Sequence, residues 1–102
     1  MLAQSAAAQQ LEATVITQYN DALATNLASF LQSNHGAVGK IVHTGAAFNK
    51  VINNPTAYGA ADATCYNSDG VSCVWWNDYH PGLAVHKAVA DAVAEACKGS
   101  FW

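Results

Sequence analysis

The stretch "VWWNDYHPGLAVHKAVADAV", residues 74–93, decides how this sequence is interpreted. It opens with an apolar, aromatic run, places Asn77, Asp78 and His80 directly after that run, and continues past Pro81 with the spacing of a helix. A proline at the first position is typical of a helix that starts there. Two interpretations follow. Either His80 is a catalytic base held at the end of a strand, or the stretch is an ordinary strand–turn–helix junction.

The composition limits the kind of protein to which this stretch can belong. The chain has 102 residues, of which 52% are hydrophobic and 11% charged, well below the usual share of about a quarter charged residues. We therefore expect much of its surface to be covered by something else. The net charge is −3, Arg is absent and the four Lys are scattered, which excludes a nucleic-acid-binding surface. No apolar run is long enough to span a membrane, and the first ten residues lack the pattern of an export signal.

Outward from this stretch, hydrophobic spacing predicts the order α-β-α-β-α. An amphipathic helix is expected over residues 2–32, ended by Gly36, and a second, short helix over 46–54, before Pro55. Short buried strands are expected at "KIVHTG" (40–45) and "CVWW" (73–76), with a polar loop over 56–72 between the second helix and the second strand. The last helix should run from Pro81 to about residue 97.

Two strands separated by a helix usually pair in parallel through a right-handed crossover. A parallel sheet of two strands does not form a domain, because such sheets contain several strands and are covered on both faces. We therefore predict that residues 1–102 are a single partial domain of a larger α/β protein. The unpaired sheet edges would also favour self-association of the isolated chain.

Nearly the whole chain resembles a known enzyme family, including "QYNDALATNL" (18–27) and "KIVHTGAAFNKVINNP" (40–55). The resemblance is most specific at "NPTAYG" (54–59) and "WWNDYHPG" (75–82), within residues 53–93. They resemble the C-terminal part of the GDSL/SGNH hydrolases, in the branch of secreted lipases/acylhydrolases and carbohydrate acetylesterases. This resemblance implies a three-layer α/β/α, flavodoxin-like fold and hydrolysis of esters by a serine nucleophile. It also implies secretion, a small-molecule or carbohydrate ester as substrate, and no cofactor or metal.

The resemblance assigns His80 as the general base, which takes the proton of the serine and later protonates the leaving alcohol. In the family, the acid that orients this base lies three residues before it, but here that position is Asn77 and the acid is Asp78. Three arrangements are open. In the first, Asn77 or a backbone carbonyl orients His80 in a Ser–His dyad. In the second, Asp78 reaches His80 through an altered turn, and in the third, Asp78 is a surface or capping residue. The first is favoured.

Other parts of the family's active site have no counterpart in this sequence. There is no Gly-Asp-Ser block for the nucleophile, and the Gly and Asn blocks that supply the oxyanion donors are missing. The chain is therefore expected to carry the base of an esterase site and to be inactive alone. The three aromatic residues around His80 would line the substrate cleft or pack beneath it: Trp75, Trp76 and Tyr79. The alternative function is a non-catalytic binding or assembly module that docks an apolar surface onto a partner.

Cys65 and Cys73 enclose the loop "CYNSDGVSC". They can close it as a disulfide, which would suit a secreted protein, or remain two reduced, small hydrophobic side chains. We predict the disulfide under oxidising conditions, with Cys97 free. Of the remaining histidines, His86 is expected on the inner face of the last helix, and its spacing from His80 does not favour a zinc pair.

Overall fold

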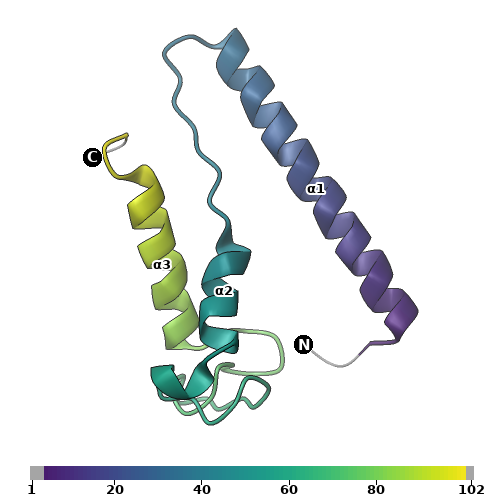
Figure 1. The fold of residues 1–102 in the computed structure, drawn as a ribbon, viewed down its shortest axis with the longest axis vertical. Coiled ribbons are helices and arrows are strands. Elements are labelled where there is room, and N and C mark those ends of the chain that lie inside the picture. Colours follow the sequence, from purple (N-terminus) through teal and green to yellow (C-terminus); the bar gives the residue numbers. More distant parts are fainter. Residues whose placement is uncertain (1–3, 101–102) are drawn as a thin grey trace. The chain divides into compact units, whose positions relative to one another are not determined.

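The computed structural model describes residues 4–100, which divide into two compact units, residues 4–41 and 42–100. The first unit is built on helix α1 (Ala6–Ser33) (Figure 1). Ser5 caps this helix, because its hydroxyl oxygen accepts a hydrogen bond of 3.2 Å from the backbone N–H of Ala8. The predicted end also holds, since Gly36 takes a positive φ of 92° just after the helix. None of the residues of α1 is buried.

The second unit consists of two α-helices, one short 3₁₀ helix and a long loop (Figure 1). Helix α2 (Thr44–Ile52) packs against α3 (Leu83–Cys97), and η1 (Pro55–Tyr58) follows α2. Apolar residues from both α-helices and from the loop make the core: Val51, Ala60, Val74 and Val85. Phe48 and Trp75 pack against this core. The core is small, so the loop between η1 and α3 depends on other interactions for its shape.

The predicted three-layer α/β/α fold is wrong for this chain. Residues 4–100 contain no sheet, and residues 40–43 form no regular element. "CVWW" forms only isolated bridges, in which Trp75 pairs once with Tyr66 in parallel and once with Pro81 in antiparallel orientation. The physical reason is that a strand is stabilised by its neighbours, and an apolar β-prone run without a partner strand does not become one.

The helix predictions from the sequence are correct in position and differ at their ends. Helix α2 begins at Thr44, inside the run expected to form the first strand. Helix α3 begins at Leu83, after Pro81 and Gly82 have completed a turn. Within the described residues, no helix has the length and apolar character that a membrane crossing requires.

Candidate functional site

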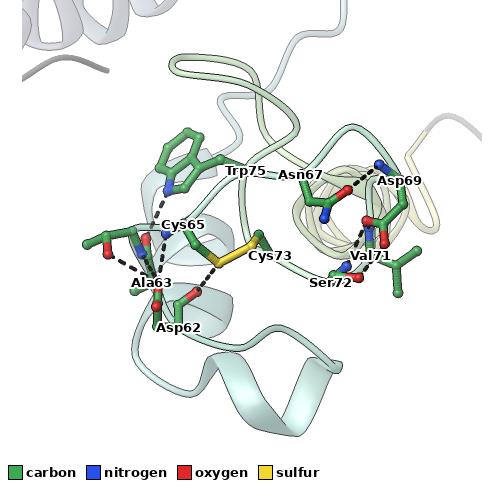
Figure 2. Close-up of a disulfide and its surroundings, with 10 residues drawn as sticks. Asp62, Ala63, Cys65, Asn67, Asp69, Val71, Ser72, Cys73 and Trp75 are labelled. Carbon is green, nitrogen blue, oxygen red and sulfur yellow. Dashed lines mark hydrogen bonds between the residues drawn. A yellow bond between two sulfur atoms is a disulfide. The ribbon is translucent and has the colours of Figure 1, made fainter.

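The loop that precedes His80 is closed by a disulfide between Cys65 and Cys73, whose Cα atoms are 5.4 Å apart (Figure 2). Two aspartates shape the backbone around it. Asp62 accepts hydrogen bonds from the backbone N–H groups of Thr64 (2.8 Å) and Cys65 (2.7 Å). Asp69 accepts hydrogen bonds from the backbone N–H groups of Val71 (2.8 Å) and Ser72 (2.9 Å). These side chains satisfy backbone donors that have no helix or sheet partner.

Both carboxylates are held in their charged form by these hydrogen bonds. The backbone N–H of Cys65, followed by the Thr64 donors, lowers the pKa of Asp62 below its ordinary value. The hydroxyl of Ser72, which donates to Asp69, lowers the pKa of Asp69, and the backbone donors of residues 71 and 72 add to the effect. The disulfide loop is therefore braced at both ends by ionised carboxylates.

The disulfide loop in turn holds the segment that carries His80. The N–H of Asn67 donates to the carbonyl of Trp75 at 3.0 Å, and the indole N–H of Trp76 donates to the carbonyl of Ser68 at 2.9 Å. The N–H of Leu83, at the start of α3, donates to the carbonyl of Gly70 at 2.9 Å. The loop thus contacts the segment before His80 and the helix after it, and it fixes the position of the turn between them.

Residues 76–80 form a narrow turn with His80 at its end. The N–H of Trp76 donates to the carbonyl of His80 at 2.8 Å, and the N–H of Gly82 donates to the carbonyl of Val74 at 2.7 Å. Gly82 lies where a side chain would not fit, because a Cβ atom there would be 2.8 Å from the carbonyl oxygen of Gly70 and 3.0 Å from that of Val74. The glycine therefore permits the close approach of three backbone segments.

Asn77 contacts His80 inside this turn. Its Oδ1 atom lies 3.0 Å from Nδ1 of His80 and also accepts the backbone N–H groups of Tyr79 (3.1 Å) and His80 (2.8 Å). The two backbone donors require the oxygen, and not the NH₂ group, at this place. An acceptor next to Nδ1 places the ring proton on Nδ1 and leaves the lone pair on Nε2. This is the tautomer that a general base needs for proton abstraction at Nε2.

Asp78 lies elsewhere. It lines a hollow of ≈ 560 Å³ together with Asn77, Trp75 and Tyr66, and His80 is not among the residues that line it. Within residues 4–100, the carboxylate of Asp78 forms no side-chain hydrogen bond to His80. The side chain that contacts the imidazole of His80 is therefore the amide of Asn77.

The three aromatic residues have different surroundings. Trp75 is half-buried, donates its indole N–H to the carbonyl of Ala63 at 2.8 Å, and has its ring centroid 6.4 Å from that of Phe48. It packs against the core, and Figure 2 shows its indole N–H directed at the backbone beside the disulfide. Trp76 and Tyr79 remain 47% and 61% exposed, with ring centroids 6.2 and 4.1 Å from the imidazole of His80. These two rings flank the imidazole of His80.

A pocket of ≈ 240 Å³ opens beside His80 and is lined mainly by apolar groups: Gly70, Trp76, Pro81, Gly82, Leu83 and His86. The prediction for His86 is wrong, because this side chain is exposed and lies at the pocket. The spacing in the sequence could not predict that His86 lies near His80. His80 lies in the turn and not on the helix, so the periodicity of a helix does not describe the distance between the two histidines. Within residues 4–100, no serine hydroxyl forms a hydrogen bond to a histidine.

Comparison with known proteins found one relative with a clear match. Over 94 residues, which are 92% of this chain and 31% of the relative, the chain is 57% identical to an acetylesterase of Thermothelomyces thermophilus. The chain thus spans less than a third of the length of the curated relative it matches. No family model matches the chain, and no solved structure shows a significant match. The chain is therefore related to an esterase, while the GDSL/SGNH branch is not established by these comparisons.

Proposed function

We propose that this chain is the part of a serine ester hydrolase, of the GDSL lipase/acetylesterase type, that supplies the general base His80. The observation that carries the proposal is the contact between Asn77 Oδ1 and His80 Nδ1, at 3.0 Å. This contact supports an orientation and a tautomer of the ring that do not require an acid. The similarity to an acetylesterase over almost the whole chain supports ester hydrolysis as the reaction.

In the proposed mechanism, the nucleophile and the oxyanion donors come from a part of the enzyme outside this chain. Nε2 of His80 takes the proton of the serine hydroxyl as the serine oxygen attacks the ester carbonyl. The imidazolium then returns that proton to the leaving alkoxide, and an alcohol departs while an acyl-enzyme remains. A water molecule repeats the sequence, giving the free carboxylic acid and the resting serine.

Asn77 acts as a positioning residue in this proposal. Its amide oxygen orients the imidazole but carries no net charge, so it stabilises the imidazolium less than a carboxylate would. Asn77→Asp keeps an acceptor at the same atom and adds a charge. We therefore expect this variant to be at least as active as the parent.

The test is a chimera in which this chain replaces the matched segment of the Thermothelomyces acetylesterase, assayed with an activated acetyl ester. Since a positioned base contributes about 10²- to 10⁴-fold to the rate, His80→Ala should lower kcat by that factor. Asn77→Ala should lower kcat by about tenfold or more, because the ring loses its fixed tautomer and orientation. Asp78→Ala is the matched control, one residue away, and should stay near the parent value.

Two results would contradict the proposal. If His80→Ala retained the parent kcat, His80 would not be the base. If Asp78→Ala lost activity severely while Asn77→Ala did not, the orienting residue would be Asp78 and the altered-turn arrangement would hold in the working enzyme. Thermal unfolding of each variant separates loss of chemistry from loss of fold.

We further propose that the exposed rings of Trp76 and Tyr79 bind the alcohol part of a small-molecule or carbohydrate ester. Both rings lie beside the imidazole that protonates the leaving alcohol, and sugars stack on such apolar faces. Trp76→Ala should then raise KM for an acetylated sugar more than KM for a small aryl acetate. Equal changes for both substrates would argue against the stacking role. The disulfide suits a secreted enzyme, since such bridges persist in oxidising compartments.

A further inference from the structure

A further hollow, of ≈ 460 Å³, lies where the disulfide loop meets the segment before His80. Two aromatic rings, two amides and a serine line it: Tyr66, Trp76, Asn67, Asn77 and Ser68. All of them belong to the unit of residues 42–100, and none of them is charged. His80 does not line this hollow, so the proposed mechanism leaves its chemistry unassigned.

Backbone hydrogen bonds fix the orientation of both amides. Oδ1 of Asn67 accepts the N–H of Asp69 at 2.9 Å (Figure 2). Oδ1 of Asn77 accepts the N–H groups of Tyr79 and His80. A backbone N–H only donates, so the oxygen of each amide must occupy these positions. The NH₂ groups are left for the hollow, and within residues 4–100 neither of them donates a hydrogen bond.

The lining of the hollow selects the chemistry of its ligand. Each NH₂ group carries two N–H donors, which require acceptor oxygens. The indole N–H of Trp76 is already bound to the carbonyl of Ser68 at 2.9 Å, so this residue, like Tyr66, offers mainly its ring to a ligand. An anion would find no cation here, and a purely apolar ligand would leave the amide donors unpaired. A neutral sugar has both features that the lining requires, an apolar ring face and many hydroxyl oxygens.

Trp76 connects this hollow to the pocket beside His80, because it lines both. We infer that the hollow binds a neutral sugar unit next to the one whose ester is cleaved, so that the substrate is an ester of an oligosaccharide. The role of this sugar as part of the substrate rests on the proposed function. The binding of sugar by the hollow does not, since His80 takes no part in it.

The experiment titrates the ¹⁵N-labelled full chain, with its disulfide intact, with neutral tetrasaccharides of glucose, mannose or xylose. NMR follows the side-chain NH₂ signals of Asn67 and Asn77 and the indole N–H of Trp76. At least one of the neutral sugars should shift these signals to saturation. The NH₂ signal of Asn54, in the same unit but outside the hollow, should not move. Tetragalacturonate, which is anionic, should bind more weakly than the neutral sugar.

Two variants test the contacts separately. Asn67→Asp keeps the oxygen that accepts the N–H of Asp69 and removes both donors, so the Kd of the sugar should rise by about tenfold or more. Tyr66→Ala removes one ring and should raise the Kd by about tenfold. Asn54→Asp makes the same change of charge outside the hollow, and Tyr58→Ala removes a ring elsewhere; both should bind like the parent. The NMR spectrum of each variant shows whether it is folded.

The inference is overturned if no neutral tetrasaccharide shifts the three signals, or if Asn67→Asp and Tyr66→Ala both bind like the parent. Stronger binding of tetragalacturonate would overturn it as well. A chain that binds sugar, in a chimera insensitive to His80→Ala, would retain the sugar site and remove the proposed function. A chain that binds no sugar, in a chimera sensitive to His80→Ala, would do the reverse.

The chimera also tests whether the bound sugar is part of the substrate. An acetylated monosaccharide fills only the pocket beside His80, whereas an acetylated tetrasaccharide reaches the hollow too. Asn67→Asp should therefore raise KM for the tetrasaccharide more than KM for the monosaccharide. Equal changes would overturn the assignment of an oligosaccharide ester as the substrate.

Discussion

Gly82→Ala tests whether the turn that carries His80 is held by close backbone packing. The new Cβ atom would lie 2.8 Å from the carbonyl oxygen of Gly70, 3.0 Å from that of Val74 and 3.3 Å from that of Cys73. All three are backbone atoms, so no side chain can rotate away to make room. Overpacking of this kind costs about 1–3 kcal/mol.

Relief of the clash has a further cost. Moving residue 82 would lengthen the hydrogen bond from its N–H to the carbonyl of Val74 (2.7 Å) and the one from Leu83 to Gly70 (2.9 Å). Each is worth about 1 kcal/mol. We therefore expect the free energy of unfolding to fall by about 2–4 kcal/mol. For a domain of this size the melting temperature should fall by roughly 10–20 °C.

The assay is thermal unfolding of the full chain with its disulfide intact, followed by tryptophan fluorescence. Gly45→Ala is the matched control. Gly45 lies in helix α2, a Cβ atom there would have no atom within 4 Å, and alanine favours the helix by up to about 1 kcal/mol. This variant should melt at or slightly above the parent temperature. If Gly82→Ala melted within about 2 °C of the parent, the close packing argued for the turn would be refuted.

Three further outcomes are expected. Without reductant, alkylation should label Cys97 alone, because the other two cysteines are joined; labelling of all three thiols would contradict the bridge. Since hydrogen bonds lower the pKa of Asp62 and Asp69, their contribution to stability is present above the ordinary pKa of 3.8 and is lost as the pH falls below it. The melting temperature should therefore drop between about pH 5 and pH 2, and the drop should be smaller in Asp62→Asn/Asp69→Asn; an equal drop would show that other groups cause it. Lys87→Ala should leave the melting temperature almost unchanged, because both side chains of its ion pair with Asp91 are largely exposed to solvent; a large loss would give this pair an unexpected structural role.

The helices could be predicted from the sequence because their signals are local. For α1, these signals are its apolar spacing, the serine before it and the glycine after it. For α3, they are Pro81 and the helical spacing that follows it. The candidate site could be predicted in part. His80 and Asn77 are three residues apart, and a short turn is enough to bring the amide to the imidazole. The role proposed for each residue comes from the resemblance of this segment to the GDSL/SGNH hydrolases.

Strands depend on partners elsewhere in the chain, and here only the tertiary structure decided the outcome. "CVWW" has the composition of a strand, but Trp75 finds one residue on each side to pair with, so no sheet forms among residues 4–100. The position of His86 was also decided by the tertiary structure. His86 lines the pocket next to His80 because the turn at Pro81 and Gly82 sets the start of α3. Local propensity acts within a few residues, whereas pairing and packing are set by segments that the local pattern does not specify.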